Sequence, residues 1–98
     1  MPRRLRVAAR ASRDLNGISG YSYRRWGADV AVQYVSGLNA AMRRLRKMPS
    51  IGSNYGEVLE GVLRYRFKSH FLYYTVSEES VRIVPILHIR MSPKRHLL

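Results

Sequence analysis

The sequence predicts a two-layer α+β protein in which a pair of helices packs on one face of an antiparallel sheet. Three observations support this class: polar and apolar residues alternate near the N-terminus, an apolar stripe at helical spacing fills the middle, and strand-like runs fill the last third. The expected order is strand, helix, helix, strand, strand, strand (β-α-α-β-β-β). With 98 residues there is room for one core, so residues 1–98 are expected to form a single domain.

The first strand and the first helix are expected in the first quarter of the chain. Residues 3–10 begin with alternating basic and apolar side chains, which is typical of a short strand with Leu5 and Val7 on its covered face. Ser12 is then the expected N-cap of the first helix. Asp14 would lie in the first turn, where a carboxylate interacts favourably with the helix dipole.

The second helix has the clearest pattern in the chain. Its apolar residues recur at intervals of three and four and form one continuous stripe: Ala31, Tyr34, Val35, Leu38, Ala41, Met42, Leu45 and Met48. Pro49 should end this helix, because proline cannot continue the hydrogen-bond ladder. Gly27 separates it from the first helix, and so short a connection predicts an antiparallel helical hairpin.

The last third predicts an antiparallel meander. Residues 50–56 have the composition of a loop. Strands are expected at residues 63–68, 71–76 and 81–89, where the apolar period becomes two and short polar turns intervene. Pro85 removes one donor from the last strand, so it is expected at a bulge or at an unpaired edge position. Tyr73 and Tyr74 are adjacent and must point to opposite faces, and at least one of them is expected in the core.

The charge balance is strongly basic. Eighteen Lys and Arg residues face six Asp and Glu residues, giving a net charge of +12. Such a field favours a polyanionic partner, either nucleic acid or an acidic protein. The sequence has no cysteine, no secretory h-region near its start and no apolar run of about 20 residues, which predicts a soluble cytoplasmic protein.

Metal and cofactor sites are not predicted. The histidines at positions 70, 88 and 96 have no ligand-like spacing, and no cysteine is present to assist them. The segment from Gly52 to Gly56 lacks the Gly-Lys-Ser/Thr that completes a phosphate-binding loop. We therefore expect no metal and no cofactor.

Several short motifs occur together in a recognisable order. Residues 11–21 read Ala-x-x-Asp-Leu-x-x-Ile-x-x-Tyr, and they are followed by Trp26-Gly27, Ala31, Tyr34, Leu38, a Pro49-x-x-Gly52 loop and Leu87-His88-Ile89-Arg90-Met91. From about residue 4 to residue 96 the chain resembles the ParE branch of the RelE/ParE toxin superfamily. It departs from that pattern at Pro85, where arginine is frequent, and in a more basic strand at residues 65–68.

The resemblance implies a RelE/ParE-like fold and the role of toxin in a type II toxin-antitoxin system. Its antitoxin would be ParD-like, with a DNA-binding ribbon-helix-helix part and a tail that wraps the toxin. ParE-like toxins poison DNA gyrase without catalysing a reaction of their own. Relatives on the RelE side are ribosome-dependent mRNA endoribonucleases, and the fold alone does not decide between the two activities.

Two sets of binding residues are predicted from this resemblance and from the charge pattern. The expected antitoxin contacts are the cations of the basic strands: Arg64, Arg66, Lys68 and Arg82. The expected target contacts lie at the end of the chain, which is important for ParE-like toxins acting on gyrase: His88, Arg90, Met91, Lys94 and Arg95.

An mRNA endoribonuclease would use some of the same residues for catalysis. His88 would donate a proton, Arg64 and Arg82 would hold phosphate, and Glu57 would act as the base. A second interpretation of His88 is structural: its side chain hydrogen-bonds the following loop and fixes the C-terminal turn. We favour that interpretation, and we expect no catalytic residues in a gyrase-binding toxin.

Overall fold

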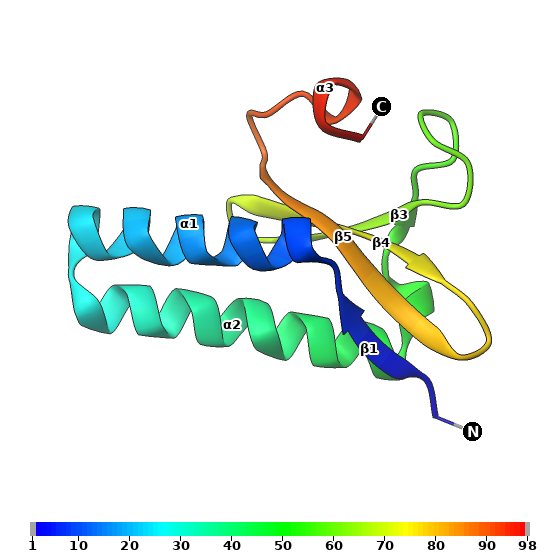
Figure 1. The fold of residues 1–98 in the computed structure, drawn as a ribbon, viewed down its shortest axis with the longest axis horizontal. Helices are drawn as coiled ribbons and strands as arrows, with labels where there is room; N and C mark the ends of the chain where they lie inside the picture. Colours follow the sequence, from blue (N-terminus) through cyan, green and yellow to red (C-terminus); the bar gives the residue numbers. More distant parts are fainter. Residues whose placement is uncertain (1, 98) are drawn as a thin grey trace.

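The computed structural model describes residues 2–97 and has the predicted order of main elements (Figure 1). These elements are β1 (Arg4–Val7), α1 (Ala9–Trp26), α2 (Ala28–Lys47), η1 (Pro49–Ile51), β2 (Ser53–Asn54), β3 (Leu63–Phe67), β4 (His70–Val76), β5 (Ser80–His88) and α3 (Pro93–Leu97). The segment expected to be a loop contains the 3-10 turn η1 and the two-residue strand β2. The short C-terminal helix α3 was not predicted.

The five strands form one sheet in the order β1-β5-β4-β3-β2. Strands β3, β4 and β5 are the antiparallel meander that the sequence predicts. Strand β1, however, pairs with β5 in parallel, so the sheet is mixed rather than wholly antiparallel. The reason is that α2 returns the chain to the end of the sheet where β1 starts, and Arg46 Nη1 donates to the Arg3 carbonyl there. The meander begins from that end, so its first and last strands run in the direction of β1.

Helix α1 begins earlier than expected, which corrects the assignment of Ser12 as its N-cap. The N-cap position is occupied by the extended Ala8, whose N–H donates to the Ile83 carbonyl. Because β1 ends at Val7 and leaves no loop, the helix starts at once and Ser12 lies within its first turn. Asp14 is therefore beyond that turn, and its Oδ2 accepts a hydrogen bond from the Ile86 N–H at 3.0 Å.

Pro85 lies at a bulge, as predicted. Leu72 pairs with Ile86 and Tyr74 pairs with Ile83, so Val84 and Pro85 together oppose Tyr73. Because the bulge leaves one residue of β5 unpaired, no hydrogen bond between β4 and β5 requires an N–H at Pro85.

The main core lies between the helical hairpin and the sheet. It contains the buried residues Ala11, Leu38, Met42, Leu45, Leu72, Tyr74, Val81, Ile83 and Ile86. Leu5 packs against this core as expected, but Val7 leaves 36% of its surface exposed because β1 is an edge strand. The stripe of α2 supplies three of the buried residues, which confirms that the stripe faces the core.

A second cluster covers the opposite face of the sheet, and we call it the outer cluster. Its buried members are Val62, Tyr73 and Leu87, and Tyr55, Leu59, Phe71 and Leu97 pack around them. Tyr73 and Tyr74 are thus both buried, on opposite faces, with 1% and 0% of their surfaces exposed. No helix in the described residues is long and apolar enough to cross a membrane.

Candidate functional site

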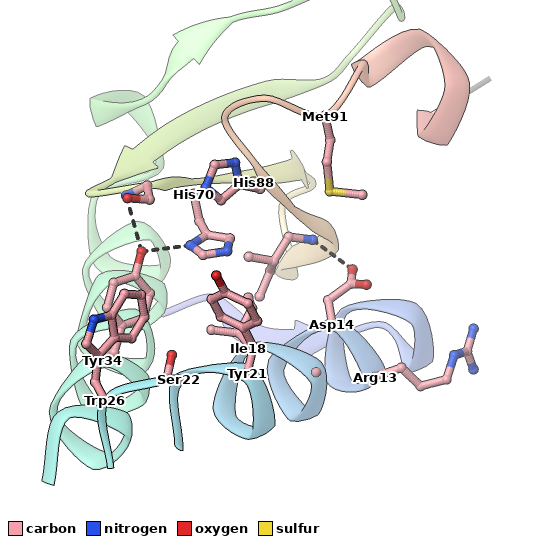
Figure 2. Close-up of a pocket in the computed structure, with 13 residues that line it drawn as sticks. Arg13, Asp14, Ile18, Tyr21, Ser22, Trp26, Tyr34, His70, His88 and Met91 are labelled. Carbon is pink, nitrogen blue, oxygen red and sulfur yellow. Dashed lines mark hydrogen bonds between the residues drawn. The ribbon is translucent and has the colours of Figure 1, made fainter. Parts of the chain in front are cut away.

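A groove of about 440 Å³ opens between α1, the turn joining β3 to β4, and the end of β5 (Figure 2). Helix α1 contributes one wall through Arg13, Asp14, Gly17, Ile18, Tyr21, Ser22 and Trp26. Tyr34, Ser69, His70, Ile86, His88 and Met91 form the remainder. We call this cavity the α1 groove.

The α1 groove exists because β1 is shorter than β5. Strand β1 pairs with β5 only as far as Ile83, so the rest of the β5 edge faces α1 instead of another strand. Pro85 has no N–H on this edge, and Asp14 accepts the N–H of Ile86. The backbone N–H groups of this part of β5 therefore need no neighbouring strand as a hydrogen-bond partner, and the strand edge can border a cavity.

Tyr34 and His70 form a polar centre in the groove. The Ser69 N–H donates to Tyr34 Oη at 3.2 Å, and Tyr34 Oη lies 2.7 Å from His70 Nδ1. Tyr34 Oη accepts the Ser69 N–H, so its own proton can be donated to His70 Nδ1. This second hydrogen bond requires that His70 Nδ1 carries no proton. Burial, with a smaller contribution from the nearby His88, lowers the pKa of His70 to about 4. Burial also raises the pKa of Tyr34.

His88 lies beside this centre and also shapes the turn that follows β5. Its ring packs edge-on against His70 with ring centroids 5.3 Å apart. Its Nδ1 accepts the Arg90 N–H at 3.1 Å, and its carbonyl accepts the Met91 N–H at 2.9 Å. These contacts are the ones that the structural interpretation of His88 requires.

The rim of the groove is apolar and open to solvent. Tyr21, Trp26 and Met91 keep 55%, 57% and 39% of their surfaces exposed. Tyr21 and Trp26 pack edge to face, with their ring centroids 5.8 Å apart. Exposed aromatic and methionine side chains around a cavity are typical of surfaces that bind the apolar side chains of another protein.

The four predicted antitoxin contacts do not form one surface. Arg64 and Arg66 alternate with core residues of β3 and point to the outer face, where the Arg64 guanidinium lies 4.4 Å from the Tyr55 ring and 4.2 Å from the Phe71 ring. Arg82 is on the same face but nearer to β1. Lys68 is in the β3–β4 turn, and its Nζ lies 5.9 Å from the Tyr34 ring at the margin of the α1 groove.

The alternative catalytic residues are also separated. His88 is on the helix-covered side of the sheet, where it contacts His70. Arg64 and Arg82 are on the outer side, since both flanking residues of Arg82 belong to the main core. Glu57 is exposed in the loop between β2 and β3. These four side chains therefore do not converge on one reacting group.

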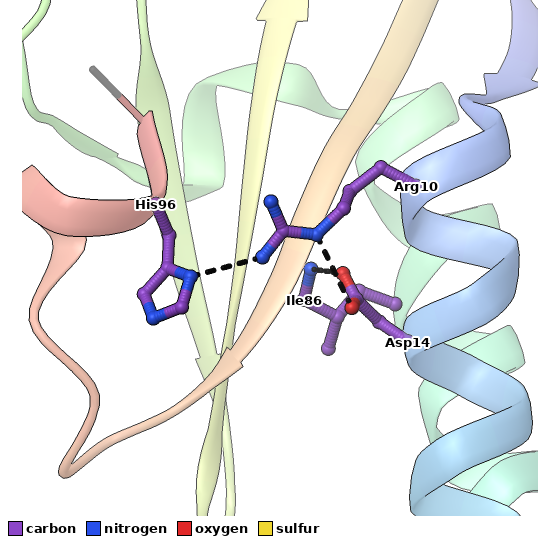
Figure 3. A network of polar contacts seen from close by, with 4 residues as sticks. All are labelled: Arg10, Asp14, Ile86 and His96. Atoms are coloured by element: carbon purple, nitrogen blue, oxygen red, sulfur yellow. Dashed lines mark hydrogen bonds and ion pairs between the residues drawn. The ribbon is translucent and has the colours of Figure 1, made fainter.

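The predicted target contacts fall into two groups. His88 and Met91 line the α1 groove, whereas Arg90, Lys94 and Arg95 are exposed on the C-terminal segment. That segment forms α3, which is held against the rest of the chain (Figure 3). Arg10 Nη2 is 3.1 Å from His96 Nδ1, and Arg10 Nε is 3.5 Å from Asp14 Oδ1.

Of the residues that line the groove, only His88 and Met91 were predicted as binding residues; its aromatic rim and polar centre, formed by Tyr21, Trp26, Tyr34 and His70, were not. Their signal in the sequence was weak, because an aromatic residue at helical spacing is more often in the core than on a rim. The one local indication of a groove was that Tyr21 and Trp26 share helix α1 with Gly17 and Gly20, whose lack of a side chain leaves space on the helix surface. Within the described residues, no group of three or more His, Asp or Glu side chains is placed to hold a metal ion.

A helical hairpin on a mixed five-stranded sheet is the RelE/ParE-like fold. A chain of a solved structure described as the chromosomal ParDE TA system from P. aeruginosa superposes with a TM-score of 0.80, covering 91% of this chain and 98% of that one at 16% identity. This likeness establishes the fold.

The sequence comparisons identify the family. The model of the ParE toxin of the type II toxin-antitoxin system, parDE, matches residues 5–93. Toxin ParE1 of Caulobacter vibrioides is 33% identical over 92 residues, which is 94% of this chain and 95% of that protein. Toxin ParE1 of Mycobacterium tuberculosis is 35% identical over 98 residues, covering 99% of this chain and 100% of that protein. The chain belongs to the ParE toxin family.

Proposed function

We propose that this chain is a cytoplasmic toxin that binds and poisons DNA gyrase and is neutralised by a ParD-like antitoxin whose tail occupies the α1 groove. The observation that carries the proposal is the groove itself, which has an exposed aromatic rim and a satisfied backbone edge. Its shape and composition suit a bound peptide.

The chemistry of the groove indicates what the antitoxin tail should look like. Tyr21, Trp26 and Met91 would receive apolar side chains from one face of an amphipathic helix. Lys68 at the margin and the net charge of +12 would attract an acidic opposite face and speed association. A disordered acidic tail that folds on binding meets both requirements.

The antitoxin site is tested by comparing two exposed tyrosines on α1. Tyr21 lines the groove, whereas Tyr23, which is 61% exposed, lines a different cavity between α1 and α2. Tyr21→Ser should weaken binding of the cognate antitoxin at least about tenfold, because truncating an aromatic anchor removes a large share of the binding energy. Tyr23→Ser is the matched control and should change affinity less than about threefold. Equal losses in calorimetric titrations would move the antitoxin away from the groove.

The gyrase part of the proposal is supported by the separation of the residues that an endoribonuclease would need. His88 lies across the sheet from Arg64 and Arg82, and its Nδ1 already accepts the Arg90 N–H. A binding mechanism needs no such convergence. The target contacts proposed for it are the exposed side chains after β5, namely Arg90, Lys94 and Arg95.

Plasmid supercoiling by purified gyrase tests this mechanism. Increasing toxin should reduce supercoiling and should accumulate linear DNA after detergent and protease treatment. His88→Ala is expected to keep this effect, and Lys94→Ala/Arg95→Ala is expected to weaken it. A toxin that arrests growth without affecting gyrase, but loses the arrest as His88→Ala with its fold intact, would support mRNA cleavage instead.

A further inference from the structure

The outer face of the sheet carries a row of arginines that lies outside the α1 groove, and two of its three members belong to neither predicted set of binding residues. Leu5 packs on the main core, so its neighbours Arg4 and Arg6 must point to the opposite face of β1. Arg82 lies between two core residues of β5 and points the same way. In the parallel ladder Arg6 is the direct partner of Arg82. We call Arg4, Arg6 and Arg82 the outer arginine strip.

The strip is unfavourable for the fold, which indicates that it serves a ligand. Like charges directly opposite on neighbouring strands repel each other. All three arginines are exposed, and among residues 2–97 the single ion pair joins Arg10 to Asp14, well away from the strip. Glu79 immediately precedes Ser80, the strand partner of Arg4, and Glu60 lines a pocket together with Thr75, the strand partner of Arg82. Neither carboxylate forms an ion pair with the strip. The positive charge is thus left without a counter-charge.

The surroundings extend the positive surface along the start of β1. Helix α2 ends beside this strand, because Arg46 donates to the Arg3 carbonyl. The last turn of α2 adds the exposed Lys47, whereas Arg44 is directed to β3, where its Nη1 donates to Tyr65 Oη at 3.3 Å. Figure 1 shows the end of α2 next to β1, on the side of the molecule away from α3.

The form of the strip favours nucleic acid over an acidic peptide. The three cavities described by the structure are lined by none of its arginines, and the strip carries no exposed aromatic side chain. A protein partner needs an apolar anchor at the centre of its interface. A phosphodiester backbone needs only a row of cations, and guanidinium groups suit phosphate oxygens.

We infer that the outer arginine strip binds the phosphate backbone of duplex DNA without sequence preference. Duplex DNA is favoured because it has the high linear charge density that releases most counterions when cations bind. The strip is on a different surface from the α1 groove, so DNA and an antitoxin tail could be held together. This inference goes beyond the proposed function and does not depend on gyrase being the target.

The test measures binding of the full chain to a fluorescein-labelled duplex of random sequence by anisotropy across a salt series. The variant R4Q/R6Q/R82Q removes the strip, and R13Q/R24Q/R25Q removes the same charge from exposed arginines of α1. The strip variant should bind at least about tenfold more weakly near 0.1 M salt, and its slope of log K against log salt should fall by about 2 to 3. The α1 variant should lose less than about threefold.

Several results would overturn the inference. Equal losses in the two variants would show a general charge effect rather than a site. Tighter binding to a polyglutamate peptide than to the duplex would assign the strip to an acidic protein, and tighter binding to single-stranded RNA would assign it to that polymer. Thermal unfolding shows whether the variants are folded. Because the strip variant no longer has the Arg6–Arg82 repulsion, its unfolding midpoint should be unchanged or higher than that of the parent chain. If that variant does not fold, Arg82→Gln alone should still reduce the slope by about 1.

Discussion

Each face of the sheet carries a cluster of buried residues, but very different parts of the chain cover the two clusters. The helix-covered face carries the main core, which α1 and α2 close with long, regular elements. The outer face carries the outer cluster, which is closed by the loop between β2 and β3 and by the five-residue helix α3. Elements held by few contacts open more easily than packed helices. From this comparison we expect one face of the sheet to be rigid and the cover of the other face to open more easily.

The largest difference should appear when a leucine is truncated on each face. Leu38→Ala in α2 should lower the free energy of unfolding by about 3 to 5 kcal/mol, because the helices and sheet around it cannot collapse into the cavity. Leu87→Ala in the outer cluster, although equally buried, should cost about 2 kcal/mol because the loop and α3 can move inward. Urea unfolding measures both values. Equal costs would show that the two faces are equally rigid.

The adjacent tyrosines give a second contrast. Tyr74 Oη donates to the Pro49 carbonyl at 2.6 Å and ties η1 to the sheet. Tyr74→Phe should cost about 1 to 2 kcal/mol, since it leaves that carbonyl without its partner. Tyr73→Phe should cost less than about 1 kcal/mol, because Arg64, the polar neighbour of the Tyr73 hydroxyl, remains stacked on Tyr55 and Phe71. A reversed order in urea unfolding would contradict the contrast.

His70 should make the rigid face sensitive to acid. Its pKa is lowered by burial to about 4 in the folded chain, below the ordinary value of 6.5. The unfolded chain therefore binds more protons in this window, and stability is lost as the pH falls from about 6.5 towards 4. Between pH 7 and pH 5 the loss from this residue should be about 1 kcal/mol, because partial solvent exposure of the ring weakens the effect.

The variant His70→Asn keeps an acceptor for the Tyr34 hydroxyl but does not titrate in this range. Its free energy of unfolding should therefore change less between pH 7 and pH 5 than that of the parent chain. An identical pH dependence in the two proteins would assign the acid sensitivity to other groups.

The smallest effect is expected where α3 contacts the outer cluster. Leu97 is only partly buried, so Leu97→Ala should reduce the free energy of unfolding by about 0.5 to 1 kcal/mol. The same change should increase hydrogen exchange at the backbone amides of residues 93–97 well before it affects those of α2. Unchanged exchange would indicate that the Arg10–His96 contact alone holds α3 in place.

The regular elements could be predicted from the sequence because each has a local signal. The stripe on α2 and the alternation in β3 gave the correct type and nearly the correct bounds. Pro85 indicated a bulge through the hydrogen bond that it cannot make. Each of these signals depends only on residues that are close together in the sequence.

The start of α1 and the outer cluster could not be predicted because their causes are distant in the sequence. Ser12 has the chemistry of an N-cap, but pairing of β1 with β5 starts the helix at Ala9. Leu97 and Leu59 lie in segments that resemble a terminus and a loop, so nothing local shows that they cover Tyr73. The α1 groove likewise joins helix, turn and strand residues that only the folded chain brings together.

The parallel pairing of β1 with β5 has a consequence for the time at which the protein becomes active. The first strand of the chain has no neighbour until the last strand exists, and the hydrogen bond from Ile86 to Asp14 spans 72 residues. Contacts this distant in sequence slow folding and postpone it until nearly all of the chain has left the ribosome. During translation the helical hairpin can form early, but the groove and the sheet edge beside it cannot. The chain thus matures in one late step, and the α1 groove is complete only when that step has occurred.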